Sequence, residues 1–152
     1  MAAQGNFEWL AEGGFVGALS AIPAITALAN VGRWRPYSPT DFQSKGYLFV
    51  HCPGCTRRED VGNVIVGDPC VIVIGAITST TPDPTGATCG ELIGLVTDFI
   101  SGSSVPALLN AAQSRLYVFP RGVTPAGQST HETTSTHHQR AITVHVRATA
   151  TA

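Results

Sequence analysis

A long apolar stretch in the middle of the chain, residues 61–100, places the strongest limit on how this sequence can fold. Within it, residues 70–77 form a nearly unbroken apolar run rich in β-branched side chains, which is typical of a strand. Residues 92–100 are a second, looser apolar run, and a polar loop with two prolines, residues 78–90, separates the two. We therefore expect a strand, a long turn and a second strand at the centre of a β-sheet.

The clearest strand pattern lies at the end of the chain, where apolar and polar side chains alternate with the period of a half-buried antiparallel strand. Ile142, Val144, Val146 and Ala148 point one way, and Thr143, His145, Arg147 and Thr149 point the other. Residues 47–52 predict another strand, and residues 103–114 predict a short helix with Pro106 in its first turn. A turn of helix is expected at residues 7–12, ending at Gly13.

Short strands, turns rich in glycine and proline, and one helical insert together predict an all-β fold with one or two short helices. We expect one domain over residues 1–152, an antiparallel β-sandwich or barrel. Residues 15–20 and 25–31 leave a choice between strands and a helical hairpin. Residues 120–139 have no apolar period and are long for a loop, so they predict a mobile loop or contact arm.

The charge content is low: charged residues make up 12% of the chain, about half the usual share, and the net charge is −1. Low charge favours a subunit whose surface is covered by neighbours, because charge is depleted in interface cores. Neither end carries a run of basic residues, so direct nucleic-acid binding is not expected. The apolar segment 15–31 contains Gly17 and Pro23 and does not predict a membrane span.

The most suggestive local motif is Cys52-Pro53-Gly54-Cys55, preceded by His51. Two thiols spaced in this way can bind zinc or form a redox pair, so a small metal-binding or redox β-domain is one hypothesis. A zinc site needs a second pair of ligands and a redox pair usually needs a following helix, and neither is evident. We therefore interpret the motif first as a structural turn, and expect reduced thiols and synthesis inside the cell.

Cys70, at the start of the central apolar run, is expected to be a buried small apolar residue. Asp68 and Asp83 each precede a proline, which is typical of turns. A structural divalent ion at a subunit boundary, held by such carboxylates, stays open as an alternative to the expectation that no cofactor binds. The sequence has no nucleophile-elbow motif and no phosphate-binding glycine loop, so we do not expect an enzyme.

Three short motifs resemble a known family. Leu48-Phe49-Val50 is followed by residues 60–74 with their Gly67-Asp68-Pro69 turn, and then by Gly90-Glu91-Leu92. Over residues 46–100 this order is similar to the jelly-roll shell domain of small icosahedral positive-strand RNA viruses of the tombusvirus and sobemovirus type. The chain departs from that family in lacking its basic N-terminal arm.

The resemblance implies a virion structural protein: a capsid or coat subunit, made in the host cytoplasm, that self-assembles into an icosahedral shell or docks on one. Its partners would be copies of itself or other virion proteins. The missing basic arm equally fits an accessory virion protein, such as a phage decoration or head–tail protein, that makes no contact with nucleic acid. Both readings use the same expected contact residues, chosen because aromatic residues and arginine anchor interfaces. They are Trp34, Arg35 and Tyr37 in the proline-rich segment, and Arg121, His131, His137 and His138 in the arm.

Overall fold

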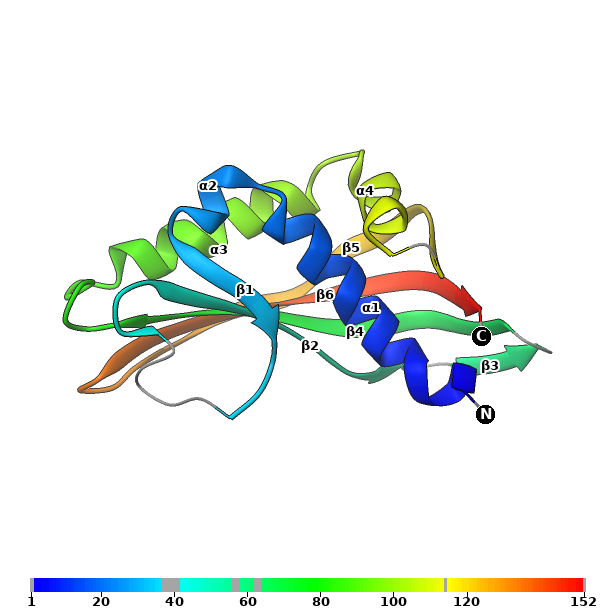
Figure 1. Cartoon of the computed structure of the whole chain (residues 1–152), viewed down its shortest axis with the longest axis horizontal. Helices are drawn as coiled ribbons and strands as arrows, with labels where there is room; N and C mark the ends of the chain where they lie inside the picture. Colours follow the sequence, from blue (N-terminus) through cyan, green and yellow to red (C-terminus); the bar gives the residue numbers. More distant parts are fainter. Residues whose placement is uncertain (1, 37–41, 56–57, 62–63, 114, 152) are drawn as a thin grey trace.

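The computed structural model describes residues 2–36, 42–55, 58–61, 64–113 and 115–151 as one mixed sheet with helices packed against it (Figure 1). The helices are α1 (Ala2–Ser20), α2 (Pro23–Thr26), α3 (Ala87–Ile100) and α4 (Val105–Ala112). The strands are β1 (Ala29–Arg33), β2 (Gly46–Cys55), β3 (Arg58–Val61), β4 (Val64–Ser79), β5 (Leu116–Thr133) and β6 (His137–Thr151).

The sheet has the strand order β1-β2-β4-β6-β5, and β3 pairs with the end of β4. Strand β1 runs parallel to β2, and the other pairs are antiparallel. The strand expected at residues 70–77 is confirmed as part of β4, which lies in the middle of the sheet. The turn expected at Gly67-Asp68-Pro69 is instead a register shift between Gly67 and Cys70 within β4. A bulge suits this position because Pro69 has no N–H to donate to a ladder.

The main core lies on one face of the sheet, between the strands and the helices. Ile72 and Ile74 of β4 and Val144 and Val146 of β6 are fully or almost fully buried there. All four helices contribute buried residues to the same cluster: Phe7, Leu10, Phe15, Leu19, Ile25, Cys89, Leu92, Val96 and Leu109. The inward-facing set Val144, Val146 and Ala148 confirms the alternation expected for the last strand.

The opposite face of the sheet carries a smaller apolar cluster and no helix among the described residues. Tyr47, Phe49 and Ile77 are buried there under Phe42, with Val73 partly buried beside them. The structure therefore has two layers, one of strands and one of helices. A layer of helices stands where the second sheet of a sandwich was expected. The chain nevertheless has more strand than helix, as expected.

Helix α3 shows why the sandwich expectation was wrong. Residues 92–100 were expected to form a strand because they are apolar and rich in β-branched side chains. Their buried members in fact follow the helical spacing of three and four residues: Cys89, Leu92, Ile93, Val96 and Ile100. No single described helix is long and apolar enough to cross a membrane, and α3 with α4, which together reach that length and composition, are bent by 100° at their junction.

Helix α1 continues through Gly13 and Gly14, where it was expected to end. It is held along its length by buried side chains on the sheet side, so two glycines do not stop it. A Cβ on Gly14 would lie 3.0 Å from the Leu116 side chain, and one on Gly17 would lie 3.0 Å from the Ala112 side chain. The glycines thus allow α1 to pack closely against α4 and the start of β5.

Residues 120–139, expected as a loop or arm, are mostly strand. Strand β5 continues to Thr133 and β6 begins at His137, so the two form a long hairpin. Two register shifts interrupt β5, between Val118 and Val123 and between Ala126 and Thr130. These irregularities explain why no apolar period was visible in the sequence. Whether this hairpin contacts other proteins stays a prediction.

Candidate interaction surface

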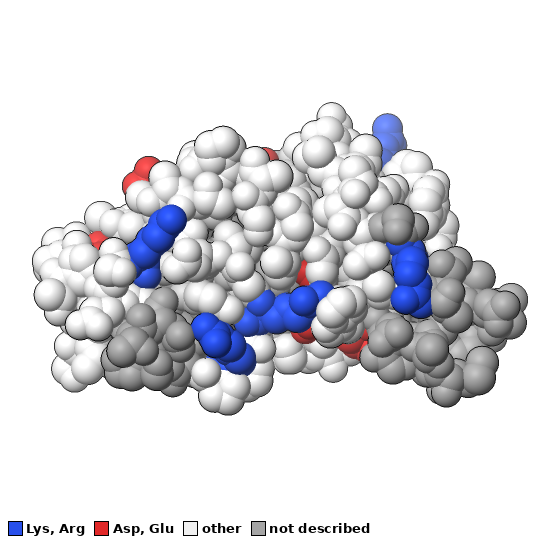
Figure 2. Space-filling view, in the orientation of Figure 1, with Lys and Arg blue, Asp and Glu red and all other residues white. Residues whose placement is uncertain are grey.

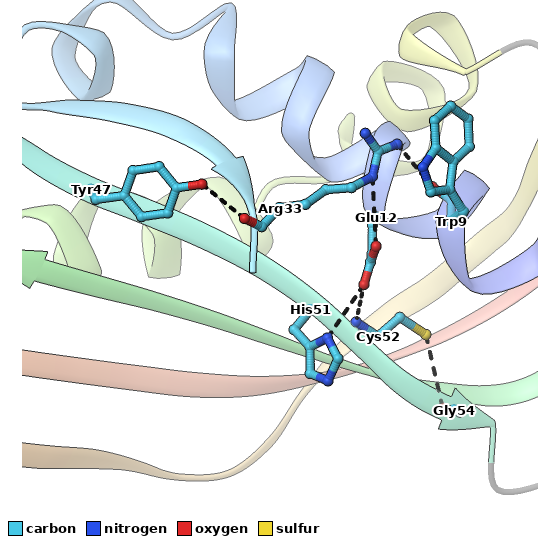
Figure 3. Close-up of polar contacts among 7 residues, drawn as sticks. All are labelled: Trp9, Glu12, Arg33, Tyr47, His51, Cys52 and Gly54. Atoms are coloured by element: carbon cyan, nitrogen blue, oxygen red, sulfur yellow. Dashed lines mark hydrogen bonds and ion pairs between the residues drawn. The ribbon is translucent and has the colours of Figure 1, made fainter. Parts of the chain in front are cut away.

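An exposed indole, Trp9, and Arg33 lie together where α1 passes the end of β1 (Figure 3), and a second exposed indole, Trp34, follows Arg33 in the chain. Trp9 is 53% exposed and Trp34 is 50% exposed, which is unusual for the largest apolar side chain. The Arg33 guanidinium carbon lies 4.0 Å from the centre of the Trp9 ring, and Arg33 Nη2 donates to the Trp9 carbonyl oxygen at 3.1 Å. We call Trp9, Arg33, Trp34 and His51 the indole rim.

Glu12 fixes this rim to the sheet (Figure 3). Its Oε2 accepts a hydrogen bond from the backbone N–H of Cys52 at 2.8 Å and lies 3.4 Å from His51 Nδ1. Its Oε1 lies 3.6 Å from Arg33 Nε, a distance for an ion pair rather than a hydrogen bond. One carboxylate on α1 therefore contacts both β1 and β2, and it holds Arg33 against Trp9.

Trp34 is positioned from the other side of the rim. Its backbone N–H donates to the Val50 carbonyl oxygen at 3.0 Å, which extends the β1–β2 pairing by one residue. Its ring lies 5.4 Å from that of His51, tilted by 42°. The hydrogen bond fixes the backbone of Trp34, and the His51 ring restricts its side chain. A partner that binds this exposed indole therefore has to order it little further, which keeps the cost in conformational entropy small.

A second exposed aromatic group lies on the helix-free face of the sheet, at the start of β5. Tyr117 is 50% exposed and meets Phe119 edge to face at 5.6 Å. The guanidinium of Arg147, on the neighbouring strand β6, lies 5.9 Å from the centre of the Phe119 ring. We call Tyr117, Phe119 and Arg147 the sheet-face patch. Tyrosine, phenylalanine and arginine are residue types enriched at protein interfaces.

A buried polar network lies at the connection from β4 to α3, next to the start of β6. Asp83 accepts hydrogen bonds from the Thr78 hydroxyl at 2.7 Å and from the backbone N–H groups of Thr88 and Cys89 at 3.2 and 3.1 Å. Burial alone would raise the pKa of Asp83, but these hydrogen bonds, with a smaller contribution from His138, hold it below its ordinary value. Asp83 therefore stabilises the first turn of α3, and its oxygens are already used by these donors.

The three histidines of the expected arm lie in different environments. His131 is exposed, and its ring stacks on that of His138 at 6.3 Å. His138 is buried, with Nε2 3.2 Å from the Pro84 carbonyl oxygen and Nδ1 3.1 Å from Thr133 Oγ1. His137 is partly buried against the Phe42 ring. Of the three, His131 is the most exposed, and whether any of them touches a partner stays a prediction.

The expected contact residues therefore do not form one surface. Trp34 and Arg35 are exposed at the β1 edge of the sheet, and Arg121 is exposed on β5, with a left-handed φ of 57°. The histidines lie at the hairpin end, and Tyr37 lies outside the described residues. Sequence reasoning missed Trp9 and Tyr117. Tyr117 could have been found, because it sits between the inward-facing Leu116 and Val118.

The environment of Cys52 does not favour metal or redox chemistry. Burial raises the pKa of its thiol to about 12, and Glu8 and Glu12 add to this effect, while a backbone hydrogen bond with Gly54 opposes it. Such a thiol stays protonated at neutral pH and is a poor nucleophile. No group of three or more His, Cys, Asp or Glu that could hold a metal occurs among the described side chains, which do not include that of Cys55.

The remaining cysteines correct one expectation. Cys70 is disulfide-bonded, where a reduced, purely apolar role was expected, while Cys52 and Cys89 are free and buried. In the β2–β4 ladder the register partner of Cys70 is Cys55. The side chain of Asp68, one of the two carboxylates considered for a divalent ion, lies outside the described side chains.

Comparisons with known proteins identify a fold but no family. No family model matches the chain, and no curated protein matches it. Among solved structures, a chain of the one described as the virion of the native gene transfer agent particle superposes with a TM-score of 0.64. The alignment covers 98% of both chains at 16% sequence identity, so the two share a fold over their whole length.

Proposed function

We propose that this protein is a structural component of a virion and associates there with other virion proteins. The observation that carries the proposal is the shared fold with a chain of the gene transfer agent virion, which spans 98% of both chains. The residue-level features agree, since the exposed large apolar side chains among the described residues include two indoles and a tyrosine, residue types that are enriched at protein interfaces.

Of the two roles left open by the sequence, we favour an accessory virion protein, of the decoration or head–tail kind, over a jelly-roll shell subunit. The described strands form one mixed sheet backed by helices, whereas the shell subunit would need two packed sheets. The accessory role also needs no nucleic-acid contact. The rim arginine supports this, because the Arg33 guanidinium already lies between Trp9 and Glu12 and is not directed to a free phosphate site.

In this proposal the indole rim is the anchor for a neighbouring virion protein. Trp9 and Trp34 together offer a large apolar area, and the Glu12 contacts with Cys52, Arg33 and His51 keep it in a fixed geometry. Burying exposed aromatic groups that are already ordered gives affinity without a large ordering cost. We propose no catalytic activity and no cofactor for the chain.

The experiment is incorporation into particles. The tagged chain is produced in cells that make the virion, particles are purified on a density gradient, and the chain is quantified against the shell protein. We expect a fixed stoichiometry, and electron microscopy of the particle should place the chain at one structural position. Absence of the chain from gradient-purified particles would overturn the proposal.

The matched variants are Trp34→Ala, in the rim, and Leu108→Ala, an exposed apolar residue on α4 that is 46% exposed. If the rim is the anchor, Trp34→Ala lowers incorporation by about tenfold or more, as expected for the loss of an aromatic hot spot. Leu108→Ala removes exposed apolar surface elsewhere and should leave incorporation unchanged. Equal effects of the two changes would assign the contact to a different surface.

A further inference from the structure

The described helices of this chain carry acidic residues and no basic ones. The helices contain Glu8, Glu12, Glu91 and Asp98, and no Lys or Arg falls within the bounds of any described helix. The basic residues lie on strands and on the connections between them, and other acidic residues, among them Glu59, Asp60 and Glu132, also lie there. Figure 2 shows Lys and Arg side chains at several separate places on one face of the molecule, with Asp and Glu beside some of them. The net charge of the chain is −1.

The outward side of α3 is a smooth acidic stripe. It consists of residues spaced by three and four positions, which lie on one side of a helix, and all of them are exposed. They are Ala87, Glu91, Gly94, Asp98 and Ser101, the last being the C-cap. A Cβ placed on Gly94 would have no described atom within 4 Å, so none of the described residues covers the middle of the stripe.

The sheet-face patch has the complementary character. Tyr117 and Arg147 are exposed and Phe119 is partly exposed, on the face of the sheet that no described helix covers. His145, two residues from Arg147 on β6, points to the same face and is partly exposed. The patch therefore combines aromatic area with a fixed positive charge, and α3 carries small side chains with fixed negative charge.

We propose that copies of this chain associate head to tail, with the acidic stripe on α3 of one copy packed on the sheet-face patch of the next. The proposal deepens the proposed function and rests on it. In this contact, helix α3 of one copy covers the sheet face of the next copy that has no described helix of its own. It also pairs Arg147 of that copy with Glu91 or Asp98 of α3. The occupant is a second copy because the chain itself supplies both complementary surfaces and is close to neutral overall.

This contact joins two different surfaces, so each copy keeps one of them free for another neighbour. In a dimer held by such a heterologous contact, each end still has one free surface. Further copies can therefore add until the assembly closes into a ring or meets another component. The arrangement therefore also predicts that association depends on protein concentration and weakens as salt is added, because the charges lie near solvent.

The test uses sedimentation of the purified full-length chain over a range of concentrations, with charge-reversal variants. Glu91→Lys and Arg147→Glu should each weaken self-association by about tenfold or more, as expected when like charges face each other. An equimolar mixture of the two variants should associate more strongly than either alone, because one reversed stripe can then meet one reversed patch. Glu132→Lys, an exposed acidic residue on β5 outside both surfaces, is the charge-matched control and should behave as wild type.

A wild-type chain that stays monomeric at high concentration would overturn the inference, as would variants that associate like wild type. Loss of association without recovery in the mixture would also reject it, because it would assign the patch to some other acidic partner. Particle incorporation separates this inference from the proposed function. If the chain is monomeric but still enters virions, only the head-to-tail contact is rejected. If the chain associates but never enters virions, the proposed virion role is rejected.

Discussion

The ring of Phe49 occupies the space directly over Gly75, its register partner across the β2–β4 ladder. A Cβ at Gly75 would overlap the Cζ and Cε1 atoms of that ring. The glycine therefore lets an aromatic side chain lie down on the central strand, on the face that no helix covers. This pair closes the small apolar cluster under Phe42 and keeps that end of the sheet dry.

Replacing Gly75 by alanine should lower the free energy of unfolding by about 1–3 kcal/mol, the usual cost of overpacking a filled site. Urea denaturation followed by tryptophan fluorescence measures the change. The combination with Phe49→Leu should recover part of the loss, because a smaller side chain leaves room for the new methyl group. Strictly additive effects of the two changes would show that the ring does not rest on Gly75.

The buried carboxylate Asp83 makes stability depend on acid pH. Its pKa is lower in the folded protein than in the unfolded chain, so it stabilises the fold above the unfolded value, about 4. That contribution is lost as the pH falls through the folded pKa. Asp83→Asn should therefore lower stability at pH 7 and reduce the change in stability between pH 5 and pH 2, measured by thermal unfolding. Glu132→Gln, at an exposed position on β5 outside the surfaces proposed for contact, is the matched control for the loss of a carboxylate.

The buried thiols should be protected from alkylation. Because burial raises the pKa of Cys52 to about 12 and also raises that of Cys89, both stay protonated at pH 8. We expect iodoacetamide to label Cys52 and Cys89 in the folded protein at least about a hundredfold more slowly than in urea, read by mass spectrometry of peptides. Rapid labelling of Cys52 in the folded chain would restore the redox interpretation of the Cys52-Pro53-Gly54-Cys55 motif.

The strands were largely predictable because their signal is local. Residues 47–52, 70–77 and 142–149 each carry a short apolar or alternating pattern, and each is found in β2, β4 or β6. Helix α3 was missed for a physical reason: Ile93, Val96 and Ile100 are β-branched residues that favour strands, and only their three- and four-residue spacing marks the helix. Packing on the sheet then decides in favour of the helix.

The interaction surface was only half predictable. Trp34 could be named in advance from its residue type, but its neighbours come from elsewhere in the chain. Arg33 reaches the Trp9 carbonyl oxygen across 24 positions, and Glu12 reaches the Cys52 N–H across 40. No sequence period joins residues so far apart, and the path of α1 over the sheet alone brings them together.

The contacts of Glu12 lead to the last prediction, which concerns how the rim is held. Glu12→Ala leaves the backbone N–H of Cys52 without its acceptor and Arg33 without its carboxylate partner. An unsatisfied buried donor costs about 1–3 kcal/mol, so the free energy of unfolding should fall by that amount. Glu12→Gln keeps an acceptor oxygen for Cys52 but removes the negative charge beside Arg33 and His51. It should keep most of the stability while freeing the Arg33 side chain, seen as a change in Trp9 fluorescence in a Trp34→Phe background. If Glu12→Gln destabilises the fold as much as Glu12→Ala, the charge rather than the hydrogen bond to Cys52 joins α1 to β2.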